Sequence, residues 1–414
     1  MNARLSLLMF LLYAVMGAWV PLFTLLLRQR GLSADETGWC CATSALGALL
    51  APFVWGQIAD RWLAAQKCIS LCALLCGLAL LALAELGAAW AIFLVSLIHW
   101  FFMYPASNLT TALTFRHLED PQKEFGAVRL WGTVGWVAAG WLVGFWLRAH
   151  YWFAETPMAD DAEPDWSPSL RLGAGVAFLL ALYALTLPDT PPSPSRASAE
   201  AGPLRRLFEA PLLALRLLRQ PSLALLCFCL FGLYITIPFY SQLTPLLLHH
   251  LGVPDRWLPV TLTLAQSLEI VTLGMLPILL LRLEEKGTLF TGMSAWSFGM
   301  LAWSFAAPLW LVVAALGANG IFICCFIVTA QMVINRRCPH DIRASAQGMI
   351  QFINGLGLLI GHVLVGRLRY LFNEDFTPIF SVAAILAGML TVLFVAFFRT
   401  PAGSAPAAPP QSRL

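Results

Sequence analysis

The chain has 414 residues, of which 59% are apolar and only 11% are charged. This composition excludes an ordinary soluble domain, in which about a quarter of the residues carry charge. The formal net charge is +3 and the basic residues form no patch, so nothing indicates a nucleic-acid partner. Apolar runs of about 20 residues, the length at which a helix crosses the hydrocarbon core, recur along the chain. We therefore predict an all-α membrane protein.

Twelve apolar windows are long enough to cross a bilayer. The first, from Leu5 to Leu27, is too long for the core of a signal peptide and lacks a cleavage site of small residues, so we interpret it as an uncleaved helix. Most of the 25 Lys and Arg residues fall at the termini and in the even-to-odd loops. By the positive-inside rule, both termini are predicted to be cytoplasmic. The windows start near Leu5, Gly38, Cys68, Ala89, Arg129, Leu170, Ser222, Trp257, Thr288, Leu309, Ile342 and Pro378.

A motif of glycine and opposite charges follows the second window, in "GQIADRWLAAQK" from Gly56 to Lys67. Gly56 permits close contact between helices, while Asp60 and Arg61 can pair with a neighbouring helix end and hold one conformation. We interpret these three residues as a gating or structural loop. The alternative is an ordinary cytoplasmic turn that anchors the topology.

The fifth window opens with "RLWGTVGW", in which Arg129, Gly132, Thr133, Trp136 and Gly140 form one stripe of a helix. A cation, a hydroxyl group and an aromatic ring then point the same way, as in a binding face. The alternative is that Arg129 extends to the membrane surface and the glycines serve helix packing.

A linker divides the chain after the sixth window. Residues 189–221 begin Pro/Ser-rich and continue from Leu204 to Leu218 as a predicted basic amphipathic helix on the membrane surface. Residues 1–188 and 222–399 are the predicted halves, and 400–414 a disordered tail. "LLLRQRGLS" in the first half matches "LLLHHLGVP" in the second, and "WLVG" matches "VLVG" at nearly the same offset. Parallel repeats of six helices are typical of major facilitator transporters, whose site lies at the midplane between the halves.

The eighth window contains an acid, in "LTLAQSLEIVTLGML". Glu269 lies near the middle of the run from Val260 to Leu281, and it is the one acid assigned to membrane depth. Gln266 lies one turn earlier on the same face. Because a buried acid is costly in lipid, we interpret Glu269 as a functional, proton-carrying residue. A structural Glu bonded across the bundle is the alternative.

Other polar residues at membrane depth favour packing over chemistry. His99, Gln331, Asn354 and His362 could line a cavity, although a polar side chain that bridges two helices is the commoner case. The cysteines suggest neither a disulfide framework nor a metal site. No cofactor is predicted. Because no "HExxH", Gly-x-Ser-x-Gly or "GxxxxGK" motif occurs, we predict neither an enzyme nor transport driven directly by ATP.

Several motifs together resemble the bacterial nucleoside and proton symporters, a branch of the major facilitator superfamily. They are "GAW" at 17–19, "IADRWLAAQK" at 58–67, "RLWGTVGW" at 129–136, "LTLP" at 185–188, "AQSLEI" at 265–270 and "IRASAQGM" at 342–349. The resemblance implies twelve transmembrane helices in two six-helix bundles, nucleoside import by proton symport with alternating access, a monomer, and a multi-pass location in the bacterial inner membrane.

The resemblance also implies which residues bind the substrate: Arg129, Thr133, Trp136, Tyr234, Gln266, Glu269, Asn319 and Ile323, with Glu269 coupling the proton. Five positions depart from the family. Tyr234 and Ile237 stand where the family tends to carry amides that contact the base. Asn319, Ile323 and Cys324 stand where the resemblance implies a tyrosine, a phenylalanine and an aspartate. These departures leave open another polar solute, such as a sugar. An exporter of apolar drugs is a further alternative.

Overall fold

The structure is a computed structural model that describes residues 1–414 except 62, 154–164, 192–217, 339–342 and 400–414. Every regular element among the described residues is a helix. The first group of helices comprises α1 (Asn2–Trp19), η1 (Val20–Leu22), α2 (Phe23–Gln29), α3 (Ala34–Arg61), α4 (Ala65–Glu85), α5 (Ala89–His117), α6 (Pro121–Phe153) and α7 (Ser167–Leu185). The second group comprises α10 (Pro221–His250), η3 (Asp255–Trp257), α11 (Leu258–Leu262), α12 (Leu264–Ser304), α13 (Leu309–Phe322), η4 (Ile323–Val328), α14 (Thr329–Arg337), α15 (Arg343–Leu371) and α16 (Phe376–Phe397).

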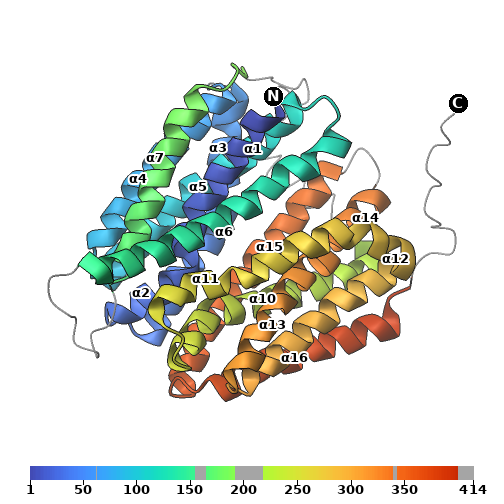
Figure 1. Cartoon of the computed structure of the whole chain (residues 1–414). Coiled ribbons are helices and arrows are strands. Elements are labelled where there is room, and N and C mark those ends of the chain that lie inside the picture. The colour runs from blue at the N-terminus through green and yellow to red at the C-terminus, as the bar shows by residue number, and fades with distance from the viewer. Residues whose placement is uncertain (62, 154–164, 192–217, 339–342, 400–414) are drawn as a thin grey trace, which may run out of the picture.

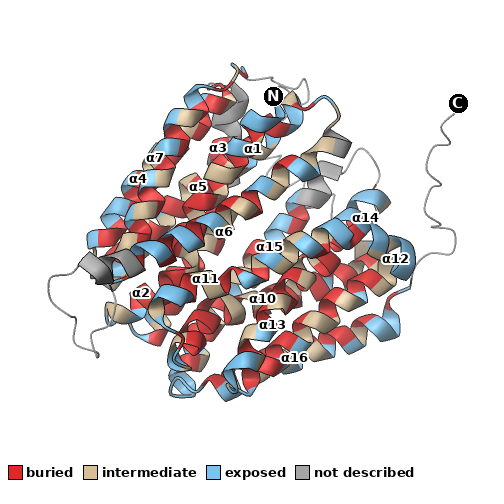
Figure 2. Ribbon diagram, viewed as in Figure 1, coloured by how far each residue is buried: buried red, intermediate tan, exposed pale blue. Residues whose placement is uncertain are grey.

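Within the described ranges, ten helical segments are long and apolar enough to cross a membrane. Large apolar side chains are also exposed on the outside of the molecule: Trp90 and Trp310 are each 70% exposed, and Phe145 is 68% exposed. Figure 2 shows that such exposed positions recur on the outward faces of the helices, while buried residues lie between them. Exposing this surface to water would cost about 25 cal/mol per Å², a cost that lipid tails remove. The chain is therefore a multi-pass membrane protein.

Most helices begin within a few residues of the predicted windows, but the start of one helix was predicted wrongly. Helix α6 begins at Pro121, so Arg129 lies two turns inside it rather than at its start. The hydropathy window missed this part because "PQKEFG" is polar, although proline is favoured in a first helical turn. The window predicted near Thr288 agrees with the structure, because α12 comprises two helices that meet at a kink at Glu284, whose backbone is non-helical at φ 57° and ψ −176°.

The two groups of helices lie side by side, as the colours of Figure 1 show: blue to green for α1 to α7, and yellow to red for α10 to α16. Within the first group, α1 packs against α6 and α7, and α4 packs against α5 and α7. Within the second, α10 packs against α15 and α16, and α12 packs against α13 and α16. Contacts between the groups join α3 to α15, α6 to η3, α11 and α12, and α2 to α10.

Four glycines bring the two groups into backbone contact, and we call them the glycine junction: Gly38, Gly140, Gly144 and Gly366. A methyl group added to Gly38 would lie 3.1 Å from the Gly366 Cα atom, and one on Gly144 would lie 2.7 Å from the carbonyl oxygen of Arg256. On Gly140 it would lie 2.8 Å from the Thr263 methyl carbon. The junction lies toward the end of the molecule that carries the α2–α3, α10–η3 and α15–α16 turns. At these four positions the groups approach each other too closely for a side chain.

The predicted loop motif is partly helical. Gly56, Asp60 and Arg61 belong to the last turns of α3, which ends at Arg61. The chain changes direction only after these three residues. The predicted amphipathic helix at 204–217 and the tail at 400–414 lie outside the described residues. The start of the predicted linker is attached to the first group, because the Thr190 amide donates to the Gln66 side chain at 3.0 Å. All ten cysteines are buried.

Candidate functional site

Helix α6 presents a cation and a hydroxyl group one turn apart. Arg129 is half-buried, and Thr133 is only 6% exposed. The guanidinium carbon of Arg129 lies 4.1 Å from the centre of the Tyr13 ring on α1, which is a cation–π contact. The Arg129 side chain makes no hydrogen bond or ion pair with another described residue. The Tyr13 ring therefore holds the charged group in place, and no anionic side chain among the described residues forms an ion pair with it.

Glycines on both helices let α1 approach α6 closely. A methyl group on Gly17 would lie 2.7 Å from the Trp136 Cα atom, and one on Gly135 would collide with the backbone of Phe10. Small residues at a helix interface allow this backbone-to-backbone packing in membranes. These contacts hold the backbone of Trp136 against α1. Trp136 is half-buried and belongs to the predicted stripe of α6.

Helix α12 presents the acid. Gln266 and Glu269 lie one turn apart and are both half-buried. The backbone of Glu269 is held by helix α13 and the π-helix η4, since a methyl group on Gly320 would lie 2.5 Å from the Glu269 nitrogen, and the Cys324 thiol donates to the Glu269 carbonyl oxygen at 3.3 Å. The Glu269 carboxylate has no hydrogen-bond or ion-pair partner in the part of the chain that the structure describes.

Arg129 and Glu269 are brought together from opposite groups of helices. The two side chains lie within electrostatic range of each other, but they do not form a salt bridge. Tyr240 on α10 and Cys324 on η4 also lie within electrostatic range of Glu269. Opposite charges that face each other unpaired in a region of low dielectric constant leave free energy available for a ligand or a proton. The arrangement can therefore hold a polar molecule between cation and acid.

The other binding residues predicted in the second group of helices differ in their surroundings. The side-chain oxygen of Gln266 is buried and has no partner among the described residues, so it can accept a hydrogen bond. Asn319 and Ile323 lie on the same span as Gly320 and Cys324, where α13 passes into a π-helix at Ile323. Such π segments are frequent at functional sites. Tyr234 packs against Gly357 of α15 and interacts with Tyr104 of α5, which places it on a different side of α10 from the contacts of Glu269.

Two of the other polar residues predicted at membrane depth, His99 and His362, bridge helices, as the commoner case predicts. The Gln242 amide nitrogen on α10 lies 2.7 Å from the His362 Nδ1 atom on α15. His99 Nδ1 on α5 lies 3.4 Å from the Cys76 carbonyl oxygen on α4. The Asn354 side-chain oxygen is buried and has no partner within the described ranges.

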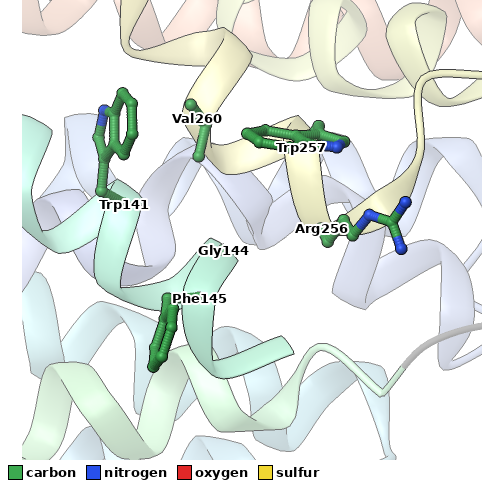
Figure 3. Close-up of a pocket in the computed structure, with 6 residues that line it drawn as sticks. All are labelled: Trp141, Gly144, Phe145, Arg256, Trp257 and Val260. Carbon is green, nitrogen blue, oxygen red and sulfur yellow. The ribbon is translucent and has the colours of Figure 1, made fainter. Parts of the chain in front are cut away.

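Two surface hollows contain none of the predicted binding residues. Figure 3 shows one of about 170 Å³ between α6 and η3–α11, where Trp141 and Phe145 expose their rings and the Arg256 guanidinium points away from them. The other, of about 540 Å³, is polar and lies at the turns beside Arg28, His250 and Arg369. Neither hollow includes Arg129 or Glu269. Within the described residues, no group of three or more His, Cys, Asp or Glu could hold a metal ion.

Sequence reasoning missed two aromatic residues of this site. Tyr13 stacks on Arg129, and Tyr240 lies near Glu269, with its ring 5.1 Å from that of Trp303. Both occur in long apolar helices, where a tyrosine looks like any other packing residue. The available signal was the spacing of Tyr13 from Phe10 and Gly17, which puts all three on one face of α1.

Comparisons with known proteins show which family this chain resembles. The family model described as "Nucleoside H+ symporter" matches residues 1–403. The chain is 30% identical to the putative nucleoside transporter YegT of Escherichia coli (strain K12), over 96% of this chain and 94% of that protein. It is 26% identical to the xanthosine permease of the same organism, over 96% and 95%. A crystal structure of the nucleoside transporter NupG superposes with a TM-score of 0.78 at 22% identity, covering 96% of this chain and 99% of that one, which shows a shared fold.

Proposed function

The chain belongs to the nucleoside H⁺ symporter family, and from this membership we propose that it imports nucleosides across a bacterial inner membrane together with protons. The observation that carries the proposal is the pair Arg129 and Glu269, which lie within electrostatic range of each other on the two groups of helices, with no ion-pair partner for either charge among the described residues. The family is one of transporters, and a site built from unpaired binding groups is consistent with carriage of a solute.

We infer that the architecture is two six-helix bundles with twelve membrane crossings. The non-helical residue Glu284 divides the long α12 into two lengths, each able to cross the membrane. Helix α3, with 28 residues, supplies another crossing beside the ten apolar segments. The bundles are residues 1–188 and 222–399. A site between them at the midplane supports alternating access, in which one bundle rocks against the other.

The substrate would lie between α6 and α12. The Arg129 guanidinium can donate hydrogen bonds to ribose hydroxyl groups, and the unpartnered oxygen of Gln266 can accept one. The Thr133 hydroxyl can do either. Trp136 offers a ring on which a base can stack, and Asn319 and Ile323 would contact the substrate from the second group of helices.

Glu269 would carry the proton. Its carboxylate is half-buried at membrane depth and without a hydrogen-bond partner in the described ranges, so loading and release of a proton changes an uncompensated charge. Arg129 opposite it links that charge to substrate binding, because both groups would contact the same bound molecule.

The packed glycine junction supports a conformation closed at the outer side. In this assignment the α2–α3, α10–η3 and α15–α16 turns face outward and both termini face the cytoplasm. The end of α3, with Gly56, Asp60 and Arg61, then forms the cytoplasmic turn whose contacts change as the site opens. We further propose that the protein works as a monomer in the bilayer.

Uptake of tritiated uridine, adenosine and xanthosine into proteoliposomes tests the proposal. We expect an inward proton gradient to increase uptake by the wild-type protein, and the substitution Glu269→Gln to abolish the effect of the gradient while equilibrium exchange of nucleoside persists. Glu85→Gln is the matched control, because Glu85 is an exposed acid paired with Arg171 at 2.9 Å, away from the site.

Two results would contradict the proposal. If Glu269→Gln kept the gradient dependence of the wild type, the proton would be carried elsewhere. If none of the three nucleosides bound while a sugar or an apolar drug did, the site would serve one of these other solutes.

A further inference from the structure

Tyr13 has a position that packing alone does not require. Its ring is half-buried on α1 and lies against the Arg129 guanidinium, 4.1 Å from ring centre to guanidinium carbon. The Tyr13 hydroxyl group makes no hydrogen bond with any described residue. The aromatic face, rather than the hydroxyl group, is therefore the part of Tyr13 that this structure uses.

The slot that holds this stack is built by a glycine. A methyl group on Gly132 would lie 2.7 Å from Tyr13 Cδ2 and 2.9 Å from Arg129 Nη1, so any side chain at this position would push the ring and the guanidinium apart. Gly132 is one turn from Arg129 on the same face of α6. Its absent side chain leaves room for the two groups to lie on each other.

Two backbone contacts set the register of the slot. Phe10 lies against Gly135 and Gly17 lies against Trp136, one on each side of Tyr13 along α1. Residues 10, 13 and 17 share a helix face, so these contacts fix the ring of Tyr13 at the level of Gly132. The α1–α6 interface thus places the Tyr13 ring against the guanidinium group of Arg129.

We propose that Tyr13 is a positioning residue that holds the Arg129 guanidinium in its substrate-binding orientation, in a slot opened by Gly132. The inference rests on the proposed binding role of Arg129. Arginine has many rotamers, and without the ring its guanidinium could turn toward the unpaired carboxylate of Glu269 on α12. The stack keeps cation and acid apart, so that both remain available to the substrate. The aromatic face attracts the cation without neutralising it.

The test compares Tyr13→Leu, which removes the ring, with Tyr13→Phe, which keeps it. Binding and uptake of tritiated uridine, adenosine and xanthosine are measured with the full chain in proteoliposomes. We expect Tyr13→Leu to raise the KM by about 3- to 30-fold, the range that a cation–π contact corresponds to, with a smaller change in the maximal rate. Tyr13→Phe should stay within about twofold of the wild type.

A matched control comes from a second cation–π pair far from the site. Arg367 lies over the ring of Tyr370 at 5.1 Å near the end of α15, where Tyr370 is exposed, so Tyr370→Leu should leave the KM unchanged. Thermal melting of each variant separates weaker binding from misfolding.

The outcomes separate this inference from the proposed function. If the wild type binds nucleosides and Tyr13→Leu keeps its KM, the positioning role is wrong while the function stands. If Tyr13→Phe loses binding as fully as Tyr13→Leu, the hydroxyl group acts on the substrate and the stack is not the cause. If the wild type itself binds none of the three nucleosides, the failure lies with the proposed function.

Discussion

Individual residues at the start of α3 secure the helix that carries Gly38. The Ser33 amide and hydroxyl group both donate to the Glu36 carboxylate, at 2.8 and 2.7 Å, and the Glu36 amide donates back to the Ser33 hydroxyl oxygen at 3.3 Å. This is a capping box. Glu36 lies just before the predicted membrane window that starts near Gly38. The hydrogen bonds from Ser33 lower the pKa of the Glu36 carboxyl group.

That lowered pKa predicts a pH-dependent effect of the substitution Glu36→Gln. Because the folded-state pKa lies below the unfolded value of about 4.3, the stabilisation by ionised Glu36 is fully present above that value and is lost as the pH falls through the folded-state pKa. We expect the variant to melt about one or two degrees lower at pH 7, since the group is exposed and screened. Melting curves at a series of falling pH values check this, and a difference that does not shrink as the pH falls below the unfolded value would contradict it.

At the scale of residues, the important charged side chains could be predicted from the sequence, but their position relative to each other could not. The polarity of Glu269 in an apolar run and the helical stripe of Arg129 and Thr133 are visible in the letters alone. That Arg129 faces Glu269 depends on how two distant helices meet, which no local pattern contains. Tyr13 was missed for the same reason, since its partner is 116 positions away and only the fold brings them together.

Among the elements, the pair α12 and α13 controls the position of the acid. Gly320 lies directly on the α12 backbone, and an added methyl group would meet the Glu269 nitrogen at 2.5 Å and the Ala265 oxygen at 2.6 Å. We expect Gly320→Ala to push the helices apart, to lower stability by about 1–3 kcal/mol, and to weaken nucleoside binding strongly. Thermal melting and binding assays measure the two effects.

The control for this substitution is Gly317→Ala, one turn earlier on α13. There the added methyl group would meet only the end of the Leu268 side chain, at 2.6 Å, and that side chain can rotate away. Equal losses in both variants would mean that the contact with the Glu269 backbone has no special role.

Element boundaries were predictable only where hydropathy changes. The starts of α5 at Ala89 and α13 at Leu309 coincide with the predicted windows, because a polar or proline-containing turn precedes each apolar run. The π-helix from Ile323 to Val328 gives no such signal, since "ICCFIV" is as apolar as an ordinary helix. The kink of α12 at Glu284 lies where the predicted eighth and ninth windows meet, because the charged residues there interrupt the apolar pattern.

For the whole molecule, the glycine junction predicts how transport responds to bulk at one end. We expect Gly144→Val to keep the junction from closing, because its side chain would collide with the Arg256 backbone. If the outer side must close in each cycle, the uptake rate should fall by at least tenfold while nucleoside binding from outside is retained. Uptake and binding in proteoliposomes measure this. Gly175→Val on α7 has open space around it and serves as the control. A normal rate in Gly144→Val would contradict the role of the junction.

The sequence predicts a division into two halves, because the offset matches indicate a repeat and the Pro/Ser-rich linker follows residue 188. The faces on which the two groups meet could not be predicted from the sequence. They depend on which of the many glycines face the other group closely, as Gly38, Gly140, Gly144 and Gly366 do.

The burial of all ten cysteines makes the native chain well suited to fluorescence experiments. A thiol-reactive dye would reach new cysteines on the surface before it reached the buried ones. Trp90 and Trp310 begin the exposed ends of α5 and α13, one in each group of helices, and each is 70% exposed. A donor and an acceptor dye at these two positions would turn the opening and closing of a single molecule into a change of energy-transfer efficiency, without prior removal of the native thiols.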